Sequence, residues 1–180
     1  MMTGILLLSF LLTGCGSPEP QTGKKMSMYY INTAETKVEV HEQYLNTKTL
    51  DEQLDETMRY LSTTPEKLEY KAPLDMGFHV LDYEVEDGKL LINVDKAYSE
   101  LSPTTEVLVR AAIVRTLTQL PNVKYVGITV EDSQLYDNAG EMVGWMNADQ
   151  FINNDGNEIN TYELVKVKLY FANAAGDKLI

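Results

Sequence analysis

Residues 78–95, FHVLDYEVEDGKLLINVD, decide how this chain folds. Asp87-Gly88 at their centre suits a type I′ turn, because both central residues of that turn need a positive φ. With these two residues as the loop, the facing pairs are Glu86 with Lys89, Val85 with Leu90, Tyr83 with Ile92, and Leu81 with Val94. A register shifted by one residue would instead place Glu84 and Asn93 in the core. The stretch therefore predicts a β-hairpin with one apolar face.

A long helix is predicted immediately after the hairpin, in SPTTEVLVRAAIVRTLTQLP. Ser102 is a suitable N-cap, and Pro103 suits the first helical position because its missing N–H is not needed there. Pro121 cannot continue a helix, so we expect the helix to stop at Leu120.

The faces of this helix and of the strand after it follow from their periodicity. The residues that give the helix its apolar face are Val107, Leu108, Ala111, Ala112, Ile113, Val114, Leu117 and Leu120. Glu106 and Arg110 are four residues apart, so we expect them to pair on the solvent side. In the following strand, residues 123–131, the expected core positions are Val126, Ile128 and Val130, and the expected solvent positions are Tyr125, Gly127 and Thr129.

The segment before the hairpin predicts two further strands and a first helix. Tyr-rich and β-branched residues between 26 and 45 suggest two short strands around Asn32 to Glu35. Thr49 and Glu52 have the spacing of a capping box, and apolar residues then recur at helical spacing up to Leu61. The order of elements favours an α+β fold, with a small antiparallel or mixed sheet and two helices packed on one face.

Two blocks of this sequence resemble a known family. EDGKLLINVDKAY, residues 86–98, followed by IVRTLTQLPNVKYVGITVED, residues 113–132, is similar to the GerMN domain of endospore-forming bacteria. The likeness spans residues 28–134 and places a GerMN-like domain at 26–134. It implies a fold like that of ring-building motifs. It also implies a non-enzymatic role in sporulation and spore germination, through assembly with other envelope or sporulation proteins or with further copies.

The first 25 residues predict export and lipid anchoring. The apolar run from Ile5 to Leu12 is too short for a permanent membrane span, which makes residues 1–15 a signal peptide. Its last four residues, LTGC, match the bacterial lipobox, so Cys15 is the predicted lipidation site and membrane lipid a predicted partner. Residues 16–25, GSPEPQTGKK, read as a flexible tether. This places the domain on the extracytoplasmic face of the cell membrane. No Lys or Arg precedes Ile5, so we expect the natural start to lie upstream of Met1.

The last third of the chain changes in composition. Residues 135–161 are rich in Asn and Gly and predict a connector, which Met142 to Met146 and Phe151-Ile152 could pin to the core. Residues 162–180 predict a strand, because apolar and lysine residues alternate in ELVKVKLYF. Tyr170-Phe171-Ala172-Asn173 echoes Tyr29-Tyr30-Ile31-Asn32, so this strand is interpreted as the start of a truncated second GerMN copy. A chance likeness between two short strands is the alternative.

No catalytic, cofactor-binding or metal-binding motif is recognisable, so we expect none of these sites and no cofactor. The chain has one Cys and two His, His41 and His79, in separate strand-like stretches. With Gly156 of NNDGNE, residues 153–158, at the sixth position of an EF-hand loop, the first and twelfth positions would be Phe151 and Tyr162, and neither is the carboxylate that such a loop needs. Nucleic acid is not an expected partner, since 27 acidic residues face 15 basic ones, for a net charge of −12.

Two other functions stay open at this point. Carboxylates are plentiful, so the protein could be a peptidoglycan hydrolase or an accessory of one, with Asp95 or Glu131 as residues to test. It could also be a solute-binding lipoprotein, although the chain is short for a two-lobed binding protein.

Overall fold

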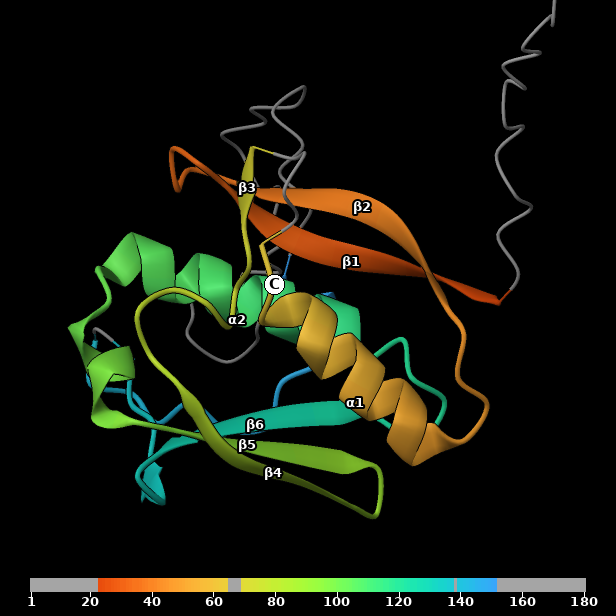
Figure 1. Cartoon of the computed structure of the whole chain (residues 1–180). Coiled ribbons are helices and arrows are strands. Elements are labelled where there is room, and N and C mark those ends of the chain that lie inside the picture. Colours follow the sequence, from red (N-terminus) through yellow and green to blue (C-terminus); the bar gives the residue numbers. More distant parts are fainter. Residues whose placement is uncertain (1–22, 65–68, 138, 152–180) are drawn as a thin grey trace, which may run out of the picture.

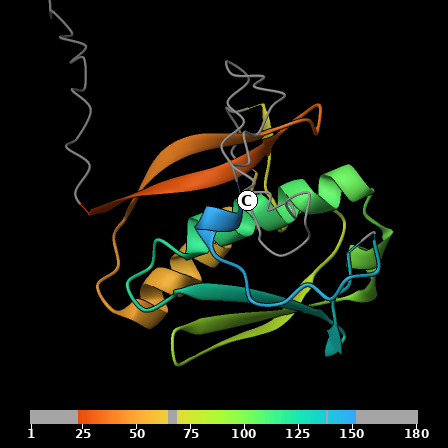
Figure 2. The same ribbon diagram turned by 180° about the vertical axis from the view of Figure 1, so that it is seen from behind.

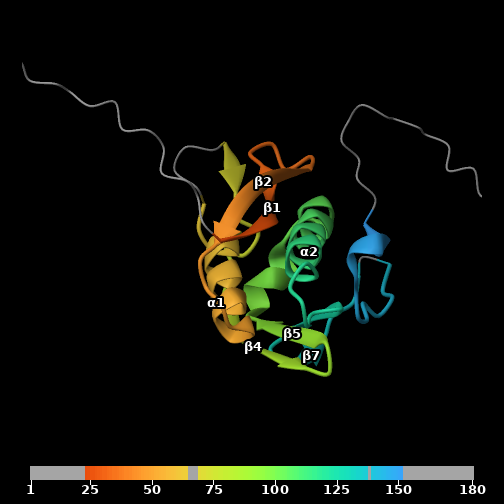
Figure 3. The same cartoon turned by 90° about the vertical axis from the view of Figure 1, so that its right-hand side faces the viewer.

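The computed structural model describes residues 23–64, 69–137 and 139–151 (Figure 1). The elements are β1 Lys24–Asn32, β2 Val38–Leu45, α1 Leu50–Leu61, β3 Tyr70–Lys71, β4 Val80–Glu86, β5 Lys89–Val94, the 3-10 helix η1 Lys96–Glu100, α2 Pro103–Leu117, β6 Tyr125–Val130, β7 Ser133–Gln134 and the 3-10 helix η2 Ala148–Gln150. The strands form two sheets, ordered β2-β1-β3 and β4-β5-β6-β7. The two helices lie between these sheets (Figures 1 and 3). The predicted α+β fold is confirmed, and each sheet has the helices on one face, but there are two sheets where we expected one.

The first sheet is built on the predicted pair of N-terminal strands. β1 and β2 pair antiparallel from Lys24 opposite Leu45 to Ile31 opposite Val38. The turn between them is held by the Asn32 side chain, whose Oδ1 accepts hydrogen bonds from the backbone N–H groups of Thr36 and Lys37 at 2.8 and 3.1 Å. Strand β1 begins earlier than expected, because Lys24 and its neighbour Lys25 pair with β2 and do not belong to the tether.

The predicted β4–β5 hairpin is confirmed, with one correction. Asp87 and Gly88 both have positive φ, at 50° and 82°, and three of the four predicted facing pairs are present, from Glu86 opposite Lys89 to Tyr83 opposite Ile92. The fourth pair is wrong, because a β-bulge at Leu81 lets Val80 face Val94 instead. A bulge inserts one extra residue into a strand, and Leu81 is accordingly 53% exposed.

The second sheet is mixed, because β5 and β6 run parallel. Parallel neighbours need a crossover connection, which η1 and α2 provide here. Asn93 of β5 is on the outer face of this sheet, as predicted, yet it is 4% exposed. Its Nδ2 donates to Asp82 and Asp132 at 3.1 and 2.8 Å, and its Oδ1 accepts from Thr129 Oγ1 and the Asp132 N–H at 3.3 and 3.0 Å. All the hydrogen-bonding capacity of this buried amide is used.

Both predicted helices form, and the second one ends earlier than expected. The capping box of Thr49 and Glu52 is present on α1. Ser102 caps α2 and Pro103 is its first residue, but α2 ends at Leu117 rather than Leu120.

The early end of α2 has a physical reason in the first sheet. The chain turns after Leu117, and Gln119 then reaches β1. It accepts a hydrogen bond from Ser27 N at 3.0 Å and donates to Ser27 O at 2.7 Å.

Val107, expected on the apolar face of α2, is 45% exposed.

Residues 135–137 and 139–151, which we call the strap, lie along β6 (Figure 2). Leu135, Val143 and Met146 are buried. The Met146 N–H donates to Val126 O at 2.9 Å, and the Val126 N–H donates to Met146 O at 2.8 Å. Gly127 is therefore buried, although we expected it to face solvent. The strap also covers part of α2, since η2 contacts that helix.

Gly127 is required by Trp145, the only tryptophan of the chain. A Cβ at Gly127 would lie 2.8 Å from Cζ3 of Trp145. We expect Gly127→Ala to lower the free energy of unfolding by about 1 kcal/mol through overpacking. The same change should move the tryptophan fluorescence to longer wavelength as the ring is displaced. Gly144→Ala is the matched control, because a Cβ there meets nothing within 4 Å. Equal effects of both changes would contradict this packing.

Asn93 allows a second test, of the outer face of the mixed sheet. Asn93→Leu keeps the size of the side chain but leaves its four partners without their bonds, so we expect a loss of about 2 kcal/mol in the free energy of unfolding. Asn122→Leu, at an exposed position, should change it by less than about 0.5 kcal/mol. Urea denaturation monitored by circular dichroism measures both. A neutral Asn93→Leu would show that this network adds nothing to stability.

Candidate functional site

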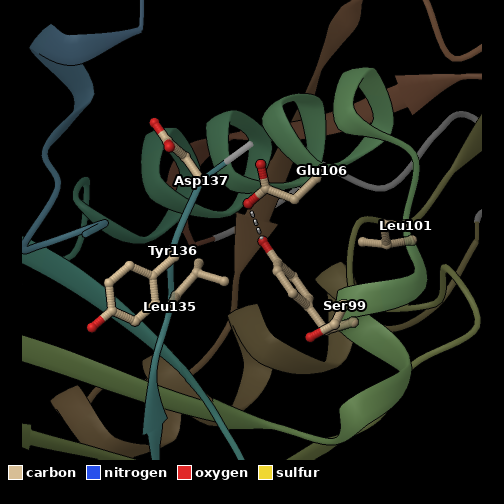
Figure 4. Close-up of a pocket in the computed structure, with 7 residues that line it drawn as sticks. Ser99, Leu101, Glu106, Leu135, Tyr136 and Asp137 are labelled. Atoms are coloured by element: carbon tan, nitrogen blue, oxygen red, sulfur yellow. Dashed lines mark hydrogen bonds between the residues drawn. The ribbon is translucent and has the colours of Figure 1, made fainter. Parts of the chain in front are cut away.

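A small cavity opens beside the N-terminal end of α2, where the strap begins (Figure 4). Its volume is about 110 Å³, and its lining residues are Tyr98, Ser99, Leu101, Glu106, Leu135, Tyr136 and Asp137. Small-molecule sites usually enclose about 300 Å³ or more. The cavity is thus large enough for a few water molecules and too small for most metabolites.

Tyr98 lines this cavity and lies on η1. The Asp95 side chain caps η1 by accepting a hydrogen bond from the Ala97 N–H at 3.1 Å. The Tyr98 ring packs edge-on against Phe78, with the two ring centroids 4.9 Å apart. This packing leaves Tyr98 1% exposed, and its hydroxyl bonds to Glu106 of α2.

Glu106 and Arg110 form a nearly buried ion pair above Tyr98. The Tyr98 hydroxyl donates to Glu106 Oε1 at 3.0 Å, and Arg110 Nη2 donates to Glu106 Oε2 at 3.0 Å. Arg110 Nε lies 2.6 Å from Oε1, although its N–H is not directed at that oxygen. Burial, together with the negative charge of Glu106, raises the pKa of Tyr98 well above its ordinary value. The phenol therefore stays protonated and acts as a donor.

The solvent-side position that we expected for this pair is wrong. The side chains of Arg110 and Glu106 are only 13% and 12% exposed. The physical reason is the strap, which crosses this face of α2 and brings the Met146 sulfur to 3.9 Å from Arg110 Nη1. A helix face that reads as polar in sequence can be buried when its charges are paired.

The chemistry available in this cavity is limited, because its two carboxylates are occupied. Glycoside hydrolysis needs one carboxyl group to protonate the leaving group and a second to act as base or nucleophile. Glu106 is held by Tyr98 and Arg110. Asp137 Oδ1 accepts from the N–H groups of Ala139 and Glu141, both at 2.9 Å, and so closes a turn. This arrangement is typical of a structural ion pair next to a turn.

The other candidates from sequence lie apart from the cavity or outside the described residues. Cys15 and the loop at 153–158 are outside, as are the predicted strand and second copy at 162–180. His41 is on β2. His79 lies just before β4 of the second sheet, and its Nδ1 is 2.8 Å from Asp95 Oδ2. The hydrogen bond with His79 lowers the pKa of Asp95. The structure does not bring the two histidines together, and the sequence analysis did not single out Tyr98 or Asp137 as site residues.

In residues 23–64, 69–137 and 139–151, no three His, Cys, Asp or Glu side chains are grouped so that they could hold a metal ion. In the same ranges, no helix has the length and apolar character needed to cross a membrane.

Comparison with solved structures identifies the fold. The first GerMN domain of the sporulation protein GerM from Bacillus subtilis is similar, with a TM-score of 0.55 and 14% identity, over 71% of this chain and 99% of that one. The tandem GerMN domains of the same protein give a TM-score of 0.50 and 18% identity, over 75% of this chain and 49% of that one. The present chain thus spans about half of the tandem structure. No curated protein matches the sequence.

Comparison with protein families agrees with the fold. The family called Germane, described as "Sporulation and spore germination", matches residues 27–136, which is 110 of the 180 residues. The match includes both blocks from which the resemblance was inferred, and that inference is confirmed. The protein belongs to the Germane family of sporulation and spore germination.

Proposed function

We propose that this protein is a non-enzymatic lipoprotein, anchored on the extracytoplasmic face of the cell membrane, that assembles with other envelope proteins during sporulation or spore germination. The observation that carries the proposal is the family match over residues 27–136, which covers both sheets and both helices. Family membership supplies the biological setting. Anchoring rests on the lipobox, and assembly rests on the surface of the domain.

Anchoring at Cys15 would hold the domain close to the membrane. Strand β1 begins at Lys24, so only residues 16–23 separate it from the lipidated residue. Fully extended, such a segment reaches about 30 Å. The domain would then meet partners that are themselves at the membrane surface, and it would not reach far into the cell wall.

The exposed apolar side chains support contacts with other proteins. They are Val40, Leu81, Val85, Val107, Tyr125, Tyr136, Met142 and Trp145, each at least 36% exposed. Tyrosine, tryptophan and methionine are enriched in protein interfaces. These side chains come from both sheets, from α2 and from the strap, so more than one contact surface is available.

Deletion of the gene in its own host tests this proposal. We expect fewer heat-resistant spores or slower germination, restored by the wild-type gene. Cys15→Ser should leave the domain folded but release it from the membrane fraction, and it should fail to restore the deletion. Spore counts, germination rates and cell fractionation measure these effects. Normal sporulation and germination of the deletion strain would overturn the assigned role, and a membrane-bound Cys15→Ser protein would overturn the anchor.

The buried ion pair allows the enzymatic alternative to be tested. Glu106→Gln leaves the Arg110 charge nearly buried beside a neutral group, so we expect a loss of about 3 kcal/mol in the free energy of unfolding. Glu100→Gln, which is exposed on η1, should change it by less than about 0.5 kcal/mol. Neither variant nor the wild type should release fragments from purified cell wall. Release by the wild type that is lost in folded Glu106→Gln would favour a hydrolase.

A further inference from the structure

The two long border strands of the sheets, β2 and β4, are the open edges of the described part of the chain. The other sides are closed. Strand β6 is covered by β7 and by Met146 of the strap. Strand β1, beyond the short β3, is bonded to α2 side chains: Ser27 to Gln119, and the Tyr29 N–H to Thr116 Oγ1 at 3.1 Å. An open edge offers unpaired N–H and C=O groups to another strand.

Strand β4 differs from β2 in its charge. On β2, Glu39 and Glu42 are neutralised by Lys37 and Lys25, with nitrogen–oxygen distances of 2.6 and 2.7 Å. On β4, the exposed acids Asp82, Glu84 and Glu86 alternate and share the outer face of the sheet. Within the described ranges none of these three has a basic nitrogen within 4 Å.

The one basic residue opposite these acids is engaged elsewhere. Lys89 faces Glu86 across the hairpin, where opposite charges would attract each other. Instead, Lys89 Nζ lies 5.3 Å from the ring centroid of Trp145, a cation–π contact. Trp145 reaches that place because Gly127 leaves room for it. The strap thus draws the lysine away from the β4 edge.

The backbone of β4 is also open on the side that faces away from β5. In the described residues, no hydrogen bond joins the backbone of residues 81–86 to anything outside the ladder with β5. The bulge at Leu81 interrupts the ladder, so the regular open edge is 82–86. Tyr83 and Val85 point to the other face of the sheet, and Val85 is 36% exposed. The edge therefore has an acidic side and a partly apolar side.

We propose that β4 accepts a β-strand from another protein, and that this strand carries Lys or Arg at alternate positions with apolar residues between them. The basic side chains lie beside the β4 carboxylates, and the apolar ones beside Val85. Main-chain bonds to 82–86 provide the pairing. This inference rests on the proposed assembly function and specifies one surface and one kind of partner for it.

A second copy of this chain is a poor occupant of the same edge. Two copies related by a two-fold axis would pair β4 with β4 antiparallel, and the axis would keep the outer faces on the same side. Asp82, Glu84 and Glu86 of one copy would then lie opposite the same acids of the other. Like charges opposite each other destabilise strand pairing. The carboxylates thus repel further copies and attract a basic strand.

A synthetic peptide tests the proposal directly. The probe is a capped heptapeptide that alternates lysine and valine, KVKVKVK, and its control has the same composition in two blocks, KKKKVVV. We expect the alternating peptide to bind the full chain and to slow hydrogen exchange several-fold at the amides of 82–86 that point away from β5. The block peptide should give no such protection. No binding of the alternating peptide up to about 1 mM, or protection confined to other residues, would overturn the proposal.

Charge-reversed variants separate the edge from the overall acidity of the chain. Glu84→Lys with Glu86→Lys should weaken binding of the alternating peptide about tenfold or more. Glu100→Lys with Glu141→Lys changes the net charge equally, at exposed residues away from β4, and should weaken it less than about twofold. Circular dichroism confirms that both remain folded. Equal weakening by both pairs would show binding to bulk charge only and overturn the proposal.

The same variants, placed in the deletion strain, distinguish this inference from the function on which it rests. Restoration of sporulation and germination by the wild-type gene and by Glu100→Lys/Glu141→Lys, but not by Glu84→Lys/Glu86→Lys, supports the β4 edge. Restoration by all three keeps the proposed function and overturns the β4 edge. A deletion strain without a defect overturns the proposed function alone, and the exchange measurement then decides on the edge.

Discussion

The fold depends on the burial of α2 between the two sheets. A helix that is covered on nearly all sides needs partners for its polar side chains, and Glu106, Arg110 and Thr116 each have one. Thr116 of α2 and Gln119, which lies just past the helix end, bond to the backbone of β1. Arg115 stacks over the ring of Tyr29 at 4.1 Å. Glu106 and Arg110 pair with each other and with Tyr98. These bonds position β1 and η1 on the helix, so the same contacts that satisfy α2 also join the first sheet to the second.

Local signals in the sequence were reliable where a backbone requirement stood behind them. Asp87-Gly88 requires positive φ, Ser102-Pro103 begins a helix, and Thr49 with Glu52 caps one, and each of these forms as predicted. The errors came from segments that are distant in sequence. Periodicity assigned Glu106 and Gly127 to solvent because it cannot show that residues 141–151 return to cover them. The bulge at Leu81 likewise cannot be seen in the alternation of residues, because a bulge adds one unpaired residue to a strand without a characteristic residue type.

The candidate cavity could not be predicted at all, and the reason is chemical. Tyr98 and Glu106 line it, and Arg110 pairs with Glu106. In the sequence, Glu106 and Arg110 read as the polar face of a helix. The one signal in the sequence was the four-residue separation of Glu106 and Arg110. It predicted the ion pair correctly and its solvent-side position wrongly. Glycoside hydrolysis would need both carboxylates free to meet a substrate. Here Arg110 and Tyr98 hold Glu106, and a turn holds Asp137, so this cavity does not offer such a pair.

The strap links the core of the domain to its outer edge. Met146 lies against Arg110 on one side and pairs with Val126 on the other, which fixes Trp145 above Gly127. Trp145 in turn attracts Lys89 and so leaves the acids of β4 without a nearby cation. Each step is short-ranged: a buried sulfur, two backbone hydrogen bonds, a missing Cβ, a ring and an ammonium group. The strap, which looks like a connector in the sequence, thereby affects the electrostatics of the open strand β4. Without the Trp145 ring, Lys89 would be available to pair with the β4 carboxylates.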